Sequence, residues 1–490
     1  MTRILQFAGA TEKLRSIQLW ATASVLVLAP LFFGSVDQFW IAVWIVVLSI
    51  TTILGVFVPL NIVQVRVVWA FLSVCLIYAI VAVIQVVPEV LTGLDDSIWQ
   101  RANDVLGTHV EPRISGTAQI QPLAIGHFLL AVTSFLSGFF AGTSKRSVGR
   151  IILAARTAVL IYAVYGLVAL AVTPNLLLWV PKVAYRGSLT ATFVNKNTAA
   201  AFFGCGAILW SCWTYSAVQS LEKSSLRTLL LNSLNERIAI SLILRASAAL
   251  TCFFALLLTN SRGGLISSSV GLLVALGVLE IDRFKRRIGY AIALSICALI
   301  ALAAWLTQMG RIASEGVIDD GRWHVYSLVA EAIGRRPFLG AGAGSFEILF
   351  PSLRTADLSN WGVWDYAHST ILEIAIEMGL PVAGMVTLAA LASIFFLVRR
   401  ALKADQHHRV SLAAIAGIAV MTYLHSLIDF SLQIPGYSIP FGILIGCGLA
   451  DATGDRSSRR RRSSRVTGDN GSTSAEKAGE AGSARTRKAS

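Results

Sequence analysis

The sequence predicts an all-α polytopic membrane protein of about twelve transmembrane helices, because its hydrophobic residues fall in continuous runs of roughly 20, the length that crosses a bilayer. Hydrophobic residues make up 55% of the 490 positions and charged residues only 14%, whereas a soluble domain carries about 25% charged residues. Continuous runs favour helices over a barrel, whose strands alternate apolar and polar residues. Lysine and arginine gather between the runs, which is typical of membrane topology.

The apolar runs define the helices in chain order. We expect them at 17–34, 39–60, 67–87, 121–142, 151–173, 198–218, 246–260, 263–281, 288–307, 368–398, 410–428 and 433–450. The first run follows three basic residues, as in a signal peptide, but it is long and no small-residue cleavage site closes it. We therefore interpret it as a retained first helix.

The segments between these helices divide by charge. Most of the lysines and arginines lie in the two terminal segments and in the loops near 61–66, 143–150, 219–245, 282–287 and 399–409. The positive-inside rule places these segments, and both termini, in the cytoplasm. The net charge of +14 is explained by this topology, so no nucleic-acid partner is expected.

Three parts follow along the chain: a cytoplasmic N-terminus over 1–16, a transmembrane domain over 17–450, and a tail over 451–490. The tail is rich in Ser, Gly and Arg, which predicts disorder, and its arginine cluster is expected to contact anionic lipids. The largest outside loop, about 308–367, is roughly 60 residues long and rich in aromatic residues, so we expect it to be structured. Within it, 322–333 reads as an amphipathic helix.

Two of the arginines expected on the outside are of interest, because the positive-inside rule makes basic residues there unusual. Arg262 lies in the turn 259–264, between two apolar runs, and Arg322 precedes Trp323 in the large loop. An arginine at the surface can hold a diphosphate headgroup with two hydrogen bonds, and an interfacial arginine with no ligand is the alternative. The glycines at 340–344 lack a strand–glycine–helix context, so we reject ATP or NAD binding there.

A second polar segment opens the helix expected from 198. Asn195, Lys196 and Asn197 precede it, and Arg186 lies in the same outside loop. Asn197 or Thr198 can serve as the helix N-cap. Two amides beside a lysine also suit sugar hydroxyls or phosphate, and both interpretations stay open.

Ionisable residues also occur in two of the last helices. His368 begins one at the outer surface, and Glu373 and Glu377 share a face of it by their spacing of four residues. The histidine can accept a proton from an attacking hydroxyl, while a helix cap and an ion pair are the alternatives for the glutamates. His425 and Asp429 are one helical turn apart and can contact each other. The pair is either catalytic or structural, and both interpretations stay open. No metal cluster or cofactor motif is found in the sequence.

Together these motifs resemble the O-antigen ligase family, polytopic proteins that share a ligase/polymerase core domain. The resemblance covers about 185–440. It rests on the segments Thr-Phe-Val-Asn-Lys-Asn, Thr-Asn-Ser-Arg-Gly-Gly, Pro-Phe-Leu-Gly-x-Gly-x-Gly-Ser-Phe, Ala-His-Ser-Thr-Ile-Leu-Glu-Ile-Ala-Ile-Glu-Met-Gly-Leu and His-Ser-Leu-Ile-Asp-Phe-x-Leu-Gln-Ile-Pro. The chain has Ser369 where the family often has Asn, and Lys196-Asn197 in place of Arg-Asn.

The resemblance implies a GT-C-like fold and a metal-independent, cofactor-free glycosyltransferase in O-antigen, exopolysaccharide or capsule assembly. Its members move a glycan from undecaprenyl diphosphate to an acceptor hydroxyl at the periplasmic face of the bacterial inner membrane. We expect His368, Arg262, Arg322 and Glu377 to be catalytic. The residues expected to bind substrate are Arg186, Asn195, Lys196, Asn197, Trp323, His425 and Asp429.

Several points stay open at this stage. The acceptor is a glycan, a lipid A core or a protein, and the sequence does not separate a polymerase from a ligase. A lipid-linked sugar flippase is one alternative function, and a non-catalytic component of an assembly complex is another. A chain-length regulator or a flippase is a possible partner protein in such a pathway.

Overall fold

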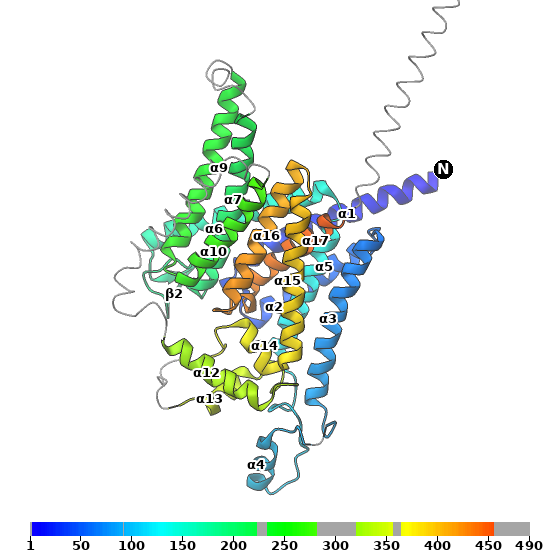
Figure 1. The fold of residues 1–490 in the computed structure, drawn as a ribbon, viewed down its shortest axis with the longest axis vertical. Coiled ribbons are helices and arrows are strands. Elements are labelled where there is room, and N and C mark those ends of the chain that lie inside the picture. The colour runs from blue at the N-terminus through cyan, green and yellow to red at the C-terminus, as the bar shows by residue number, and fades with distance from the viewer. Residues whose placement is uncertain (1, 92, 223–232, 282–319, 356–363, 455–490) are drawn as a thin grey trace, which may run out of the picture.

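The computed structural model describes residues 2–91, 93–222, 233–281, 320–355 and 364–454. In these ranges the regular secondary structure is helical, apart from one hairpin whose two strands are two residues long each. Figure 1 shows long helices running side by side, with short helices collected at one end.

The first half of the described chain holds six long helices. The elements are α1 (Thr2–Leu28), η1 (Phe33–Ser35), α2 (Gln38–Val56), α3 (Ile62–Val86), α4 (Ser97–Leu106), α5 (Pro122–Ala141), α6 (Lys145–Val172), β1 (Leu176–Leu177), β2 (Val180–Pro181) and α7 (Lys196–Glu222). β1 and β2 pair antiparallel.

The second half adds the remaining long helices and the short helices of the large loop. The elements are α9 (Ser233–Leu258), α10 (Arg262–Glu280), α12 (Asp320–Arg335), α13 (Phe346–Leu353), α14 (Thr370–Met378), α15 (Leu380–Leu402), α16 (Gln406–Ser426), η2 (Ser431–Gln433) and α17 (Pro435–Ala452). α12 confirms the amphipathic helix expected over 322–333.

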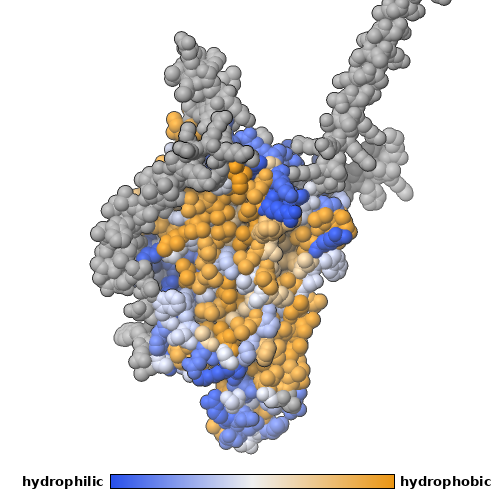
Figure 2. All heavy atoms as spheres, in the orientation of Figure 1, coloured by the Kyte–Doolittle hydropathy of each residue, from blue (hydrophilic) through white to orange (hydrophobic). Residues whose placement is uncertain are grey.

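Nine of the described helices are long and apolar enough to cross a membrane: α2, α3, α5, α6, α7, α9, α10, α15 and α16. Figure 2 shows hydrophobic side chains over the middle of the molecule and hydrophilic ones gathered at the end that carries α4. α3 presents Trp69, Leu76 and Val83 to the surroundings, each more than half exposed. An exposed apolar helix of this length suits lipid, so the chain is a polytopic helical membrane protein.

Glycines bring the helices of the bundle close together. A Cβ added to Gly138 of α5 would lie 2.2 Å from the carbonyl oxygen of Ile443 of α17, and one on Gly446 would lie 2.1 Å from that of Phe135. Gly271 of α10 faces α16 in the same way. Small residues at such crossings let membrane helices pack by van der Waals contact, since lipid supplies no hydrophobic drive.

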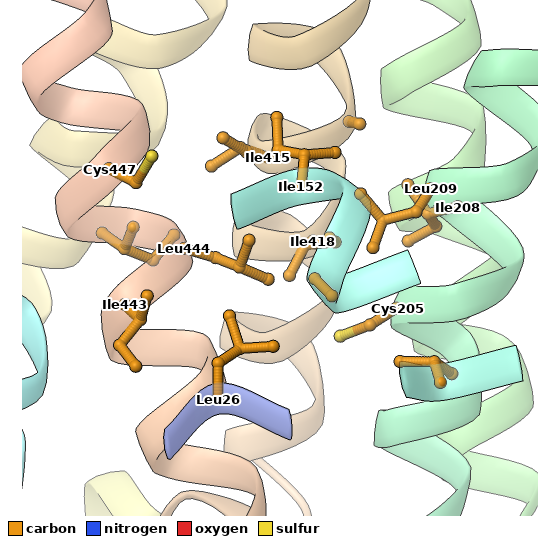
Figure 3. Packing of buried hydrophobic residues seen from close by; sticks show 14 of the residues in the cluster. Leu26, Ile152, Cys205, Ile208, Leu209, Ile415, Ile418, Ile443, Leu444 and Cys447 are labelled. Carbon is orange, nitrogen blue, oxygen red and sulfur yellow. The ribbon is translucent and has the colours of Figure 1, made fainter. Parts of the chain in front are cut away.

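The centre of the bundle is filled by aliphatic side chains and thiols from helices distant in the sequence. Figure 3 shows Leu26 of α1, Ile152 of α6, Cys205 of α7, Ile418 of α16 and Leu444 of α17 in one cluster. All of them are nearly inaccessible to solvent. This packing fixes the ends of α7, α10 and α16 relative to one another, and these ends carry the polar residues described below.

Three boundaries differ from the sequence-based expectation. The helix expected over 368–398 is two helices, α14 and α15, because Gly379 has φ = 85° and a Cβ there would lie 2.2 Å from the carbonyl oxygen of Phe338. α1 begins at Thr2 rather than near 17, and α9 begins at Ser233 rather than near 246. Both extensions contain charged residues, such as Lys13 and Glu236, that interrupt an apolar run. The helix expected at 288–307 and the tail after 454 lie outside the described residues.

The short elements α4, α12, α13 and α14 lie together at one end of the bundle, which we call the loop-rich end (Figure 1). The N-terminus lies toward the opposite end (Figure 1). Turns of the long helices that the sequence places outside, at 259–261 and 427–434, reach the loop-rich end. The candidate site residues are found there.

Candidate functional site

The segment from His425 to Phe430, which joins the end of α16 to η2, is the point where the candidate residues meet. We call it the hub. The carboxylate of Asp429 is almost fully buried (1% exposed), and it accepts a hydrogen bond of 2.7 Å from the side-chain amide of Asn197 and one of 2.6 Å from the Ser431 hydroxyl. His425 lies beside it, with 3.7 Å between its Nε2 and Asp429 Oδ1. Asn197 and Asp429 are 232 positions apart, so this bond ties α7 to the hub.

The start of α7 is organised by its own amides. Asn195 Oδ1 accepts a hydrogen bond of 2.7 Å from the backbone N–H of Asn197, which caps the helix. The sequence predicted the cap at Asn197 or Thr198, whereas the structure places it at Asn195, because α7 begins two residues earlier than expected. The ammonium of Lys196 donates to the carbonyl oxygen of Asn260 over 3.2 Å and lies 5.6 Å from the ring centre of Tyr185. Lys196 is thereby held at the turn before α10.

That turn carries Arg262 as the first residue of α10. Asn260 adopts φ = 56°, and the Ser261 hydroxyl accepts a hydrogen bond of 3.2 Å from the N–H of Gly264. A Cβ on Gly263 would lie 2.6 Å from Cδ1 of Ile428. The glycine therefore lets the turn pack directly on the hub, and Arg262 is brought beside it at the helix N-terminus, where the helix dipole also favours anions.

Arg322 reaches the hub from the large loop. Its guanidinium donates a hydrogen bond of 3.0 Å to the carbonyl oxygen of Ile428. This contact fixes the position of the Arg322 side chain at the hub. The next residue, Trp323, is 58% exposed and contacts Tyr326 edge to face, so its indole faces outward near the site.

His368 completes the arrangement from the start of α14. Its ring lies edge to face against Phe430 of the hub, with centres 4.9 Å apart, and against Trp364 at 5.0 Å. Its backbone adopts φ = 53° and its carbonyl oxygen accepts a hydrogen bond of 2.8 Å from the Tyr326 hydroxyl. A positive φ at a non-glycine residue is uncommon, and such strain is concentrated at functional sites.

The two glutamates of α14 play different parts in the structure. Glu373 Oε2 accepts a hydrogen bond of 2.7 Å from the N–H of Ala367, the residue before His368. Glu377 instead accepts one of 3.1 Å from the N–H of Phe346. Burial and its partner Glu377 raise the pKa of Glu373, and burial raises that of Glu377 to about 7. Glu373, which the sequence interpretation did not select, is the one that supports the His368 backbone.

The glycine-rich loop caps the end of α14. The N–H groups of Ala341 and Gly342 donate to the carbonyl oxygens of Ile376 and Glu377 over 2.8 and 3.0 Å. Gly340 has φ = 67°, and a Cβ there would lie 2.4 Å from the Glu377 backbone. These glycines therefore allow the backbone of the loop to contact α14 closely. The loop thereby anchors the helix that follows His368.

The remaining predicted residue, Arg186, lies farther from the hub. It is exposed, and its Nε donates a hydrogen bond of 3.2 Å to the carbonyl oxygen of Lys182. Its neighbour Tyr185 lies near enough to the hub for the charges of Asp429 and Arg322 to act on its phenol, whose pKa is raised by burial. Tyr185, Phe430 and Gln433 are contacts that sequence reasoning missed, although the last two lie in a motif it had identified.

Comparison with known families gives one finding. Residues 247–387 match the family model described as O-Antigen ligase, which confirms the resemblance. The match contains Arg262, Arg322 and His368, and it indicates a glycosyltransferase-like class of membrane proteins that handle glycans in the manner of ligases and polymerases. A search of curated proteins finds no match.

Proposed function

We propose that this chain, whose residues 247–387 belong to the O-antigen ligase family, transfers a glycan from a polyprenyl diphosphate, undecaprenyl diphosphate in bacteria, to an acceptor hydroxyl at the periplasmic face of the inner membrane. The observation that carries the proposal is that the guanidinium of Arg322 and the imidazole of His368 both contact the hub. Two further cationic residues, Lys196 and Arg262, directly adjoin residues that contact the hub, Asn197 and Gly263. A diphosphate leaving group needs such cations, and an attacking hydroxyl needs a base.

The reaction breaks the bond between the anomeric carbon and the diphosphate oxygen, and it forms one between that carbon and the acceptor oxygen. The diphosphate leaves with the electron pair and gains negative charge, which Arg262 and Arg322 stabilise. The acceptor hydroxyl loses its proton to His368, which releases it to water. Trp364 and Phe430 hold the imidazole between them, so little reorganisation is needed during transfer. No step requires a metal ion.

An apolar cavity next to the hub supports a lipid-linked donor. It has a volume of about 550 Å³, lies among α3, α15, α16 and α17, and is lined at the hub by Thr370 and Ser426. Thr370 donates a hydrogen bond of 3.3 Å to the carbonyl oxygen of Asp429. The cavity thus leads from the polar residues into the apolar middle of the bundle, as an isoprenoid chain attached to a diphosphate requires.

A flippase would instead need ionisable residues along a path through the bundle. Among the described residues, Arg156 is such a candidate within an apolar helix. Its guanidinium lies over the rings of Trp210 and Trp213, 5.0 and 4.9 Å from their centres, and the Trp210 N–H donates to its carbonyl oxygen. This is a packing arrangement between α6 and α7, so the charge distribution favours an enzyme at one face.

Single substitutions test the assignment. We expect Arg262→Ala, Arg322→Ala and His368→Ala each to lower transfer by about 100-fold, because each removes charge stabilisation or the base. Transfer is measured with purified protein in detergent, supplied with the lipid-linked glycan isolated from cells. Arg335→Ala is the control, since that arginine is exposed on α12 and pairs only locally with Glu331.

The control variant should retain wild-type activity. Wild-type rates in both Arg262→Ala and His368→Ala, with normal membrane insertion, would overturn the site assignment. Purified wild-type protein that transfers no glycan, while it still binds the lipid-linked donor, would favour a non-catalytic component of an assembly complex.

A further inference from the structure

A second, larger cavity lies next to the His368 segment. Its volume is about 740 Å³, and its walls come from α3, α5, α13, α14 and the residues Asp365 and Tyr366. It adjoins the apolar cavity, since the two share the lining residues Phe71, Val74, Thr370, Ile374 and Val386.

The charge of this cavity is opposite to that of the hub. Glu347, Asp365, Glu373 and Glu377 line it, and no lysine or arginine appears among the described lining residues. The exposed carboxylates of Glu347 and Asp365 repel phosphate groups. The diphosphate of the donor therefore belongs at the hub, and a ligand of the acidic cavity carries no phosphate on the part that enters it.

The polar groups of the cavity suit hydroxyl groups. Gln121 and Gln433 contribute amides, and Tyr78 and Tyr366 contribute aromatic rings. Buried Oε1 of Gln433 has no hydrogen-bond partner among the described residues, while its amide nitrogen donates to Glu373. A buried acceptor without a partner is costly, so it calls for a donor such as a hydroxyl. Small-molecule sites typically have apolar and aromatic walls with a small number of polar groups at fixed positions.

The cavity adjoins the proposed base. Tyr366, which lines the cavity, stacks on Phe430 with ring centres 4.6 Å apart, and His368 contacts the same phenyl ring edge to face. Glu373 lines the cavity and also accepts the N–H of Ala367. A ligand in the cavity thus meets the chain on both sides of His368 in sequence, at Tyr366 and at Thr370.

We propose that the acidic cavity binds the acceptor, and that the acceptor is a saccharide without phosphate groups, built of neutral or amino sugars. The inference rests on the proposed transfer reaction and adds the acceptor class to it. Carboxylates and amides bind the sugar hydroxyls, the aromatic rings stack on the sugar faces, and one hydroxyl is presented to His368. Because the acidic residues of the cavity repel phosphate, the cavity favours an unphosphorylated glycan over a phosphorylated lipid A core as acceptor.

Charge reversal at the rim tests the proposal in the full-length protein. Glu347 and Asp365 are exposed side chains that line the cavity, so Glu347→Lys and Asp365→Lys should fold normally. The acceptor probe is the oligosaccharide released by mild acid from the cell's own lipid-linked glycan. We expect its KM to rise at least about 10-fold with kcat within about twofold, because carboxylate–hydroxyl bonds are lost. Glu331→Lys, the same change on the exposed face of α12, should leave both constants unaltered.

Protection of Cys75 gives a readout that does not depend on turnover. Its thiol lines the cavity and is partly accessible, whereas the other described cysteines are buried. The same oligosaccharide should slow alkylation of Cys75 by N-ethylmaleimide, measured by mass spectrometry, and inorganic diphosphate should not. Glu347→Lys should weaken the protection.

The outcomes separate the two proposals. If the wild type transfers glycan but KM is unchanged in both lysine variants and the oligosaccharide does not protect Cys75, the acceptor site is elsewhere and the transfer reaction stands. If the oligosaccharide protects Cys75 but the wild type transfers nothing, the saccharide site stands and the proposed reaction falls. Protection by diphosphate would overturn the claim that the cavity excludes phosphate.

Discussion

The hub and the acidic cavity adjoin the same short segment around His368, yet they hold their ionisable side chains in opposite ways. At the hub, Lys196 and Arg322 donate to the backbone carbonyls of Asn260 and Ile428. In the cavity wall, Glu373 and Glu377 accept from backbone N–H groups. In each case main-chain groups fix the position of an ionisable side chain. The comparison teaches that the segment around His368 can join a cationic site to an acidic one.

The two sides also differ in what supports them. The hub is supported by side chains such as Asn197 and Ser431 on Asp429, and the acidic side by the backbone of the glycine-rich loop. Substitutions of single side chains should therefore disturb the hub locally, whereas added volume in the glycine loop should disturb the whole acidic side.

The largest effect is expected from Gly340→Ala. Its φ of 67° and the 2.4 Å approach to the Glu377 backbone leave no room for a Cβ, so the loop must separate from α14. We expect a loss of about 3 kcal/mol in unfolding free energy, together with most transfer activity. Thermal unfolding of the purified protein measures the first and glycan transfer the second.

Gly334→Ala is the matched control for this change. Gly334 lies within α12, where an added Cβ meets nothing within 4 Å. Alanine there should be neutral or stabilise by up to about 1 kcal/mol, because it favours helix. Equal melting temperatures for the Gly340 variant and the wild type would show that the glycine loop does not support α14.

An intermediate effect is expected from the ionisation of Glu377. Burial raises the pKa of its carboxyl from 4.5 to about 7, so the folded state binds this proton more tightly than the unfolded state. The associated stability is fully present below about pH 4.5 and is lost as the pH rises through about 7.

Glu377→Gln should therefore flatten the fall in melting temperature between about pH 4.5 and about pH 7, the two pKa values that bound the window. Glu331→Gln, at an exposed site on α12, should reproduce the wild-type profile. An unchanged slope in the Glu377 variant would mean that this carboxyl is already ionised at pH 5 and is not the buried acid of the cavity.

Sequence reasoning reached the individual residues of the hub but not their partners. Arg262, Arg322 and His368 could be identified because cations and a histidine at an outer helix end are rare against the positive-inside pattern. The bond from Asn197 to Asp429 joins positions 232 residues apart, and no periodicity within one helix encodes such a pair. The choice between Glu373 and Glu377 likewise depends on which backbone N–H groups arrive at the helix, which only the folded loop determines.

The fold, like the site, could be predicted from the sequence only in part. Apolar runs predicted the spans because bilayer thickness fixes their length, whereas the polar extensions of α1 and α9 carry no such signal. The break at Gly379 was missed because the sequence stays apolar across it. Its cause lies in the carbonyl of Phe338, a residue 41 positions earlier whose approach excludes a side chain at Gly379.

The smallest expected effect concerns the ion pair that joins the loop between α3 and α5 to the acidic side. Arg336 donates to Asp96, whose carboxylate is 7% exposed and also accepts the N–H of Ile98 as the cap of α4. Burial alone would raise the pKa of Asp96. The hydrogen bonds from Arg336 and from the N–H of Ile98, together with the charges of Arg336 and Arg101, outweigh burial, and the pKa is lowered. Its stabilisation is therefore present above about pH 4 and is lost as the pH falls.

Asp96→Asn keeps the cap and removes the charge, so it should cost only about 1 kcal/mol at neutral pH and nothing in strong acid. A double-mutant cycle with Arg336→Gln, read by thermal unfolding, should give a coupling of similar size, and Arg335→Gln should show none with Asp96. Coupling that is absent at neutral pH would contradict the ion pair. The same loop is also held by a hydrogen bond of 3.1 Å from the N–H of Gly116 to the carbonyl oxygen of Ala341. The acidic side should therefore keep its shape without the ion pair. The KM of the acceptor should change less in Asp96→Asn than in Glu347→Lys.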